Sequence, residues 1–177
     1  IDGNQIRAQV IGEGGNLGFT QLSRVEYSLS GGLSNTDFID NAGGVDCSDH
    51  EVNIKILLND VVLNGDMTLK QRNEMLVEMT NDVSQLVLDN NCQQVQAISL
   101  AQVQSADRIG EYRRLIQYLE LEGKLDRELE FIPSDESLTE RESNGLGLSR
   151  PEISVLVSYC KANLKEELIT SKVPDDT

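Results

Sequence analysis

The sequence predicts a mostly α-helical protein with a short α/β unit at its N-terminus. Residues 1 to about 45 contain nine of the 14 glycines, in clusters that separate short apolar stretches. From about residue 68 onward glycine is scarce, and apolar residues recur at helical spacing. The first texture is typical of strands and turns, and the second is typical of a set of helices.

Composition excludes several classes of function. The 177 residues include 30 acidic and 15 basic side chains, a formal net charge of −15 that repels nucleic acid and anionic membranes. Three cysteines and one histidine fit neither a disulfide framework nor a Cys/His zinc site, so no metal is expected. The chain has no basic-then-apolar leader and no 18-residue apolar run. We therefore expect a cytoplasmic protein.

The first 45 residues predict an order of strand, helix and strand. Alternating apolar residues in 5–11 indicate a strand that enters a turn at Gly12. Residues 20–29 predict a helix, and residues 36–40 predict a second strand closed by a turn at 41–44. Strands and helices in this order are typical of an α/β unit.

The stretch 52–63 fits either element. Its apolar residues alternate as in a strand and also fall on one face of a helix. We favour a helix because Ser48 or Asp49 could cap it, with Glu51 in its first turn.

The later helices carry clearer end signals. Thr68 and Gln71 have capping-box spacing, and Asn90-Asn91 suggests the end of the helix that follows. Ser105 could cap the next helix, with Gly123 as the residue just past its end.

The C-terminal third predicts one short helix and one long one. Residues 125–146 are expected to be irregular, with a short helix near Leu138. Ser149 and Glu152 then form another capping box with Pro151 in the first turn, and an apolar face follows it as far as Leu168.

The first candidate site is the run GEGGNLG, Gly12 to Gly18, directly after the first strand. Its glycines permit positive φ and a close approach of backbone to ligand, which would suit a phosphate. The run lacks the Lys-Ser/Thr of a P-loop and the G-x-G-x-x-G spacing, so an ordinary turn is the alternative. The Asn16 amide would lie at the carboxyl end of the strand, where α/β sheets bind ligands.

The second candidate site is DNAGGVDCSDHE, Asp40 to Glu51. Gly43-Gly44 permits close approach, and Ser48 at a helix start could accompany free amides that attract a carboxylate. The alternative is a turn followed by a serine cap. A local Cys47–His50 catalytic pair is disfavoured because neighbouring helical residues do not face each other, so His50 is expected to be packed or at the surface. The acids match no EF-hand spacing, and solvated carboxylates are expected.

Around these motifs the chain resembles the large-subunit, NAD-specific glutamate dehydrogenases of bacteria. The resemblance lies in GEGGNLGFTQLSRVEY, NTDFIDNAGGVDCSDHEVNIKILL, RIGEYRRLIQYLELEGKLDRELEFIP and GLGLSRPEISVLVSYCKANL. EGGN also resembles the EGAN of ordinary glutamate dehydrogenases, and NAGGV with Ser48 and Glu51 resembles their NAGGVxxSxxE. The chain departs from the ordinary pattern at Gly15, at Leu17-Gly18 and at Asp46-Cys47.

The resemblance implies a site for NAD and for glutamate. It assigns cofactor binding to Gly14, Gly15, Asn16 and Asn41. It assigns substrate binding to Gly43, Gly44 and Ser48, with Ser48 donating to the side-chain carboxylate of glutamate. It places the catalytic lysines, the catalytic aspartate and the dinucleotide loop upstream, so no catalytic residue is expected in this chain.

The resulting prediction is a fragment. Residues 1–66 would be the end of a Rossmann-like NAD-binding dehydrogenase domain, an incomplete α/β remnant, and residues 67–177 a C-terminal helical domain. The parent would convert L-glutamate to 2-oxoglutarate and ammonium with hydride transfer to NAD, while the fragment alone would be inactive. The alternative is a helical assembly or support module with no site of its own. Unpaired strand edges in 6–11 and 36–40 also suggest a homo-oligomer.

Overall fold

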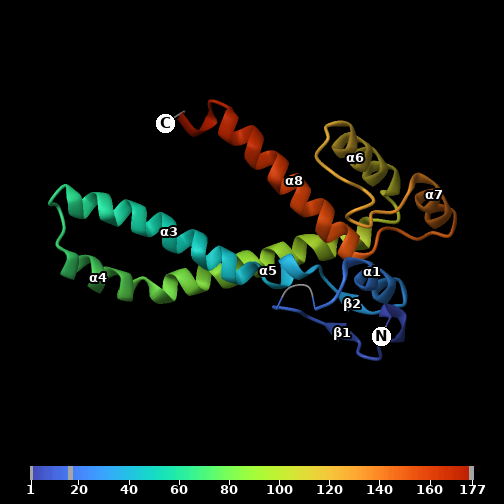
Figure 1. Ribbon diagram of the computed structural model, residues 1–177, viewed down its shortest axis with the longest axis horizontal. Helices are drawn as coiled ribbons and strands as arrows, with labels where there is room; N and C mark the ends of the chain where they lie inside the picture. Colours follow the sequence, from blue (N-terminus) through green and yellow to red (C-terminus); the bar gives the residue numbers. More distant parts are fainter. Residues whose placement is uncertain (1, 16–17, 176–177) are drawn as a thin grey trace.

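The computed structural model describes residues 2–15 and 18–175. The chain forms a compact head, a long helical hairpin and a separate C-terminal rod (Figure 1). Its elements, in chain order, are η1 (Gly3–Gln5), β1 (Val10–Ile11), α1 (Gln21–Leu29), β2 (Leu33–Ser34), α2 (Asp37–Asp40), α3 (Ala42–Leu63), α4 (Leu69–Glu78), α5 (Thr80–Gln104), α6 (Ile109–Leu121), α7 (Asp135–Ser143), α8 (Arg150–Thr170) and η2 (Val173–Asp175). The prediction of a mostly α protein with a small α/β remnant is confirmed.

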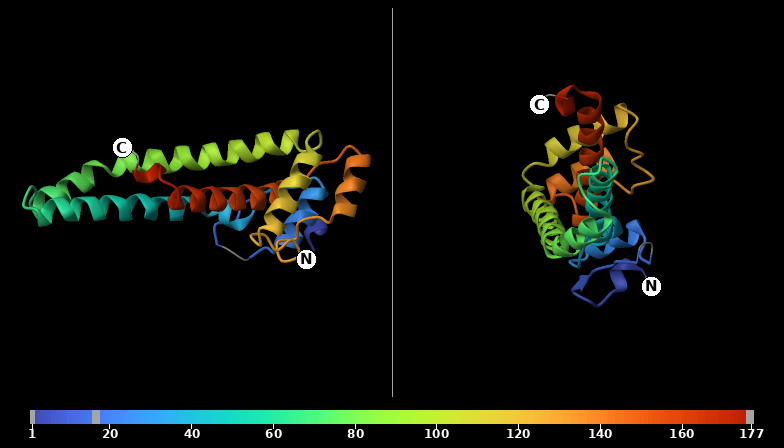
Figure 2. Two further views of the ribbon diagram at one scale, coloured as in Figure 1. Left: turned by 90° about the horizontal axis from the view of Figure 1, so that it is seen from above. Right: turned by 90° about the vertical axis from the view of Figure 1, so that its left-hand side faces the viewer.

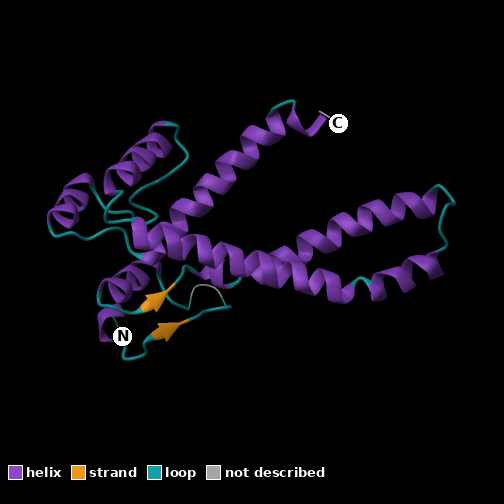
Figure 3. Cartoon of the chain, turned by 180° about the vertical axis from the view of Figure 1, so that it is seen from behind, coloured by secondary structure: helices purple, strands orange, loops and turns teal. Residues whose placement is uncertain are grey.

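The α/β remnant is a pair of short parallel strands joined through α1. Val10 lies opposite Leu33 and Ile11 opposite Ser34, and both strands lie on the edge of the head (Figure 3). Parallel strands require a crossover connection, which α1 supplies. The predicted strand at 5–11 is thus reduced to its last two residues, and the helix predicted at 20–29 is confirmed.

The second strand was predicted in the wrong place. β2 covers residues 33–34, whereas Asp37–Asp40 forms the short helix α2 after an extended Thr36. Within Asp37–Asp40 only Ile39 is buried, and Phe38 stays exposed. Asp37 in the first turn also favours the helix, because a carboxylate stabilises the positive end of the helix dipole.

α3 begins seven or eight residues earlier than the predicted cap at Ser48 or Asp49 implies. It starts at Ala42, directly after Asn41, so the turn expected at 41–44 is the first turn of the helix. Ser48 and Asp49 therefore lie inside α3 and do not cap it. Gly43 and Gly44 each weaken a helix by about 1 kcal/mol, a cost that packing of the long helix against α5 can offset.

The predicted start of α4 is confirmed, whereas the helix end predicted at Asn90-Asn91 is wrong. The Thr68–Gln71 capping box is formed: Thr68 N donates to Gln71 Oε1 at 2.9 Å and Gln71 N donates to Thr68 Oγ1 at 3.3 Å. The helix does not stop at Asn90-Asn91, and α5 continues to Gln104. The Asn91 amide donates to Val87 O at 2.7 Å, which satisfies it within the helix.

The turn between α5 and α6 replaces the cap predicted at Ser105. Ser105 is buried, and its Oγ donates to Gln102 O at 2.9 Å. α6 starts only at Ile109. Gly123, at φ +65°, follows the helix as predicted.

A buried ion pair fixes the start of α8. The Ser149–Glu152 capping box is present, and Ser149 N donates to Glu152 Oε2 at 2.6 Å. Arg141 of α7 donates to both oxygens of the same carboxylate, at 2.7 and 2.9 Å. Glu152 is 1% exposed, so α7, the short helix predicted near Leu138, is held to α8 by charge as well as by packing.

The hydrophobic core lies in the head. The end of α5, α6, α7 and the first two turns of α8 enclose it, with Ile98, Ile116, Leu138 and Ile153 completely buried. All of its members are aliphatic, as the low aromatic content requires. The hairpin of α3 with α4 and α5 extends from this head (Figure 2), and α8 leaves the head at an angle to the hairpin (Figure 1).

The residue predicted to divide the two domains, at position 66, lies at the tip of the hairpin next to Gly65 at φ +82°. α3 before it packs on α5 after it. The division itself stays a prediction. In the ranges that the structure describes, no helix has the length and apolar character needed to span a membrane.

Candidate functional site

The two glycine motifs meet in space. Glu13, in the loop after β1, donates its backbone N–H to Asp40 Oδ2 at 3.0 Å. Asp40 ends α2 and immediately precedes Asn41 and α3. Both motifs thus follow the carboxyl ends of the parallel strands, which is the edge of an α/β sheet where ligands bind.

A buried arginine fixes this junction. Arg24 of α1 is 1% exposed, and its guanidinium pairs with the Glu13 carboxylate. It also donates to Phe19 O at 3.2 Å and to Asn35 O at 2.9 Å, and it lies 5.4 Å from the centre of the Phe19 ring. Arg24 therefore joins the segments on both sides of the first glycine loop to the segment after β2.

A second arginine, from α8, reaches the same junction. Asn35 Nδ2 donates to Asp40 Oδ1 at 2.8 Å, and Arg150 Nε donates to Asn35 Oδ1 at 2.6 Å. Partial burial lowers the pKa of Arg150, and the charge of Asp40 opposes that shift. Sequence reasoning missed Arg24, Asn35 and Arg150, because no local pattern marks a contact between residues 35 and 150.

The residues predicted to bind the cofactor are placed as follows. Gly14 and Gly15 are exposed in the loop after β1, and a Cβ added to either would have open space around it. Asn16 lies outside the described residues. Asn41 is half-buried at the N-cap position of α3, and its side chain makes no capping hydrogen bond. The backbone at Gly14 and Gly15 is therefore open to the approach of a ligand.

The residues predicted to bind substrate lie on the first two turns of α3. Gly43 is half-buried and Gly44 exposed, both in the first turn. Ser48 is exposed one turn further, where its hydroxyl donates to Gly44 O at 3.1 Å. The expectation that Ser48 starts the helix is wrong, but it still projects from the N-terminal end of α3.

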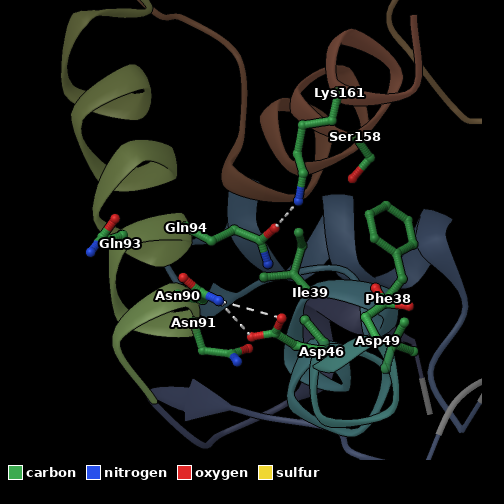
Figure 4. A pocket seen from close by; sticks show the side chains of 12 residues that line it. Phe38, Ile39, Asp46, Asp49, Asn90, Asn91, Gln93, Gln94, Ser158 and Lys161 are labelled. Carbon is green, nitrogen blue, oxygen red and sulfur yellow. Dashed lines mark hydrogen bonds between the residues drawn. The ribbon is translucent and has the colours of Figure 1, made fainter. Parts of the chain in front are cut away.

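A pocket of about 530 Å³ lies beside the second motif, between α3, α5 and α8 (Figure 4). Asp46 accepts from Asn90 Nδ2 at 3.0 Å, and Lys161 Nζ donates to Gln94 Oε1 at 2.7 Å. The lining residues are Phe38, Ile39, Ala42, Val45, Asp46, Asp49, Asn90, Asn91, Gln93, Gln94, Ser158 and Lys161. None of the predicted site residues that the structure describes lines this pocket, and its hydrogen bonds join α3 to α5 and α8 to α5.

Local catalytic and metal chemistry are not supported at the second motif. Cys47 is exposed on α3, and His50 Nε2 lies 3.6 Å from Asp46, one turn earlier on the same helix. Over residues 2–15 and 18–175, no group of three or more potential ligands could hold a metal ion.

Two parallel strands joined through a helix, followed by a series of helices, define a partial α/β unit continued by a helical segment. The family model for the bacterial NAD-glutamate dehydrogenase catalytic domain matches residues 1–101, and that for the glutamate dehydrogenase C-terminal region matches residues 145–177. The chain belongs to the bacterial NAD-glutamate dehydrogenase family.

Three curated relatives are each named NAD-specific glutamate dehydrogenase. Identity is 66% over 176 residues with the protein of Pseudomonas aeruginosa, 58% over 176 residues with that of Halomonas elongata, and 45% over 175 residues with that of Mycobacterium tuberculosis. Each alignment covers 99% of this chain and 11% of the relative. The chain thus spans about a ninth of the length of the relatives it matches.

Proposed function

We propose that this chain is the end of the catalytic domain, with the helical segment that follows, of an NAD-dependent glutamate dehydrogenase. The whole protein would oxidise L-glutamate to 2-oxoglutarate and ammonium. The observation that carries the proposal is the 3.0 Å bond between Glu13 and Asp40, which brings the two family motifs to one sheet edge. The match over residues 1–101 and the names of the three relatives support the same assignment.

Cofactor binding is proposed for Gly14, Gly15, Asn16 and Asn41. The open space at both glycines lets the loop backbone approach the dinucleotide, and the uncommitted Asn41 amide can bind a ribose or carboxamide group. NAD, when bound, supplies the hydride acceptor. The chain's own contribution is to orient it and to keep that orientation fixed.

Substrate binding is proposed for Gly43, Gly44 and Ser48 at the N-terminal end of α3. The first turn of a helix offers unpaired N–H groups and the positive end of the dipole, which both favour a carboxylate. The Ser48 hydroxyl would exchange its bond to Gly44 O for one to the side-chain carboxylate of glutamate. The isolated chain is proposed to lack dehydrogenase activity, because the family resemblance places the catalytic lysines and the dinucleotide loop outside this segment.

Replacing Ser48 tests the function. In the intact protein, Ser48→Ala should raise KM for glutamate by about tenfold, the loss of one hydrogen bond to a charged group. Ser84→Ala is the matched control, because Ser84 on α5 is also exposed and donates to the carbonyl four residues earlier, at 2.8 Å. Absence of glutamate-dependent NADH formation by the unmodified intact protein would contradict the proposal.

A second role, assembly, is favoured by an exposed apolar stripe on α3. Val45, Val52, Ile56 and Leu63 recur at intervals of seven and four residues, so they share one face, and each is more than half exposed. The buried Leu58 lies on the opposite face. A helix that is apolar on two faces is suited to burial between two neighbours. We propose a cytoplasmic homo-oligomer that uses this stripe.

Light scattering on the intact protein tests that role. Ile56→Lys should lower the assembled mass, because a buried interface does not tolerate an unpaired charge. Val77→Lys on α4, exposed and off the stripe, should leave the mass unchanged. Equal masses for both variants and the unmodified protein would refute assembly through α3.

A further inference from the structure

We propose that Arg150 of α8 is a positioning residue for the cofactor loop that follows β1. The inference rests on the proposed function and extends it, because it assigns the helical segment a part in cofactor binding. Arg150 is 115 residues from Asn35 in the sequence, and contact between them crosses the predicted domain division.

The Arg150 guanidinium is bound to α5 by hydrogen bonds. Its Nη1 donates to Ser99 Oγ at 2.9 Å and its Nη2 donates to Val95 O at 3.4 Å. Ser99 Oγ in turn donates to Val95 O at 2.8 Å. The guanidinium is therefore held by a helix of the core, and its planar fork leaves Nε aimed at one further acceptor.

Further hydrogen bonds connect Arg150 to the loop. Arg150 Nε donates to Asn35 Oδ1, which fixes the amide so that its Nδ2 donates to Asp40 Oδ1. The other oxygen of Asp40 accepts the backbone N–H of Glu13. Three consecutive hydrogen bonds thus run from α8 to the residue that precedes Gly14.

The Glu13 carboxylate, at the start of the glycine loop, contacts the end of the loop and α1. The Glu13 carboxylate accepts from Gly18 N through Oε1 and pairs with buried Arg24 through Oε2. Glu13 therefore holds both ends of the glycine loop. An added Cβ at Gly14 or Gly15 would meet nothing, so packing does not hold these two residues, and the polar contacts of Glu13 fix the start of the loop.

The consequence is that contacts made by the helical segment pre-organise the cofactor loop. A loop ordered before binding loses less conformational entropy when the ligand arrives, so the ligand binds more tightly. Loss of the Arg150–Asn35 bond should weaken NAD binding without removing any group that touches NAD.

Titration calorimetry with NAD⁺ on the intact protein tests this inference. Arg150→Gln and Asn35→Ala should each raise the Kd for NAD⁺ by about five- to tenfold, the net contribution of about one hydrogen bond. Both residues act through one chain of contacts, so their effects should not add. The Kd of the double variant for NAD⁺ should therefore lie within about twofold of the Kd of Arg150→Gln. Arg108→Gln, which removes an exposed arginine paired with Glu111 on α6, is the matched control and should leave the Kd unchanged.

Melting temperatures separate positioning from general stability. If Arg150 only stabilises the fold, Arg150→Gln lowers the melting temperature while the Kd for NAD⁺ stays constant, and the inference is overturned. Additive effects of the two substitutions overturn it as well. Asn35→Ala alone carries the test if Arg150→Gln does not fold. An unmodified protein that binds no NAD⁺ overturns the proposed function together with this inference, whereas normal binding that is insensitive to Asn35→Ala overturns only the inference.

Discussion

Replacing Glu152 with glutamine should destabilise the head more than any exposed charge replacement. The carboxylate accepts three hydrogen bonds, two from Arg141 and one from Ser149 N, at 2.6 to 2.9 Å. A glutamine side chain in its place would keep one acceptor oxygen and turn an N–H donor toward the guanidinium. Arg141 would then be a largely buried cation without its partner.

The magnitude follows from the burial of the pair. Removing one partner of a buried ion pair costs about 3–5 kcal/mol. Arg141 is 12% exposed and glutamine retains one acceptor, so the lower end of that range, about 3 kcal/mol, is expected. With an m-value of roughly 2 kcal/mol per M, the urea midpoint should fall by about 1.5 M.

Urea unfolding of the chain, followed by circular dichroism at the helical band, measures this change. Glu111→Gln is the control, because Glu111 pairs with Arg108 on an exposed face of α6 and should leave the midpoint unchanged. Equal midpoints for Glu152→Gln and Glu111→Gln would refute the assignment of the buried pair as a major stabilising contact.

Three further predictions concern the head. Burial and the bond to Glu130 raise the pKa of Tyr159 to about 12, so this tyrosine should ionise well above pH 10 in a spectrophotometric titration. The stability that the bond contributes is full below about pH 10 and should be lost as the pH approaches about 12. A titration in which every tyrosine ionises near pH 10 would contradict this. Leu138→Ala should cost about 3 kcal/mol in urea unfolding because the site is fully buried, whereas Leu121→Ala, at 86% exposure, should cost little. Gly147→Ala should lower the melting temperature by several degrees. The added Cβ would lie 2.0 Å from Ser105 Oγ and 2.5 Å from Ala106 N, in the turn between α5 and α6. An unchanged melting temperature would show that this turn can move.

The helix ends that the sequence predicted correctly are those set by local chemistry. Thr68 and Ser149 cap helices through residues three positions away, and Gly123 adopts a conformation that glycine favours. Such contacts form within one turn, so spacing alone reveals them. The fold class was also predicted from local pattern, because glycine clusters give way along the chain to apolar residues at helical spacing.

Two of the wrong predictions share a different cause. Ser48 and Asn90 look like helix ends, yet α3 and α5 continue through both because each helix packs along the other. Their polar side chains are satisfied there, Ser48 by a carbonyl of its own helix and Asn90 by Asp46 across the hairpin. Tertiary packing thus outweighs local preference, and nothing within a short window of sequence shows it.

Only part of the candidate site could be predicted from the sequence. The motifs that contain Gly14 and Asn41 were found because glycine clusters and family resemblance mark them. Their junction was not, since Arg24 and Arg150 reach it from other elements, and Arg150 is far away in sequence. A single sequence carries no record of which distant polar residues pair.

The proposed cofactor site at the junction of the two motifs is tested most directly by the affinity of the intact Asn41→Ala variant for NAD⁺. We expect the Kd to rise by about tenfold, because one hydrogen-bonding amide at the motif junction is lost. Asn53→Ala, on the same helix, should leave the Kd unchanged, since the Asn53 amide only donates to Asp49 O. Equal affinities for the two variants would contradict the assignment of this junction as the cofactor site.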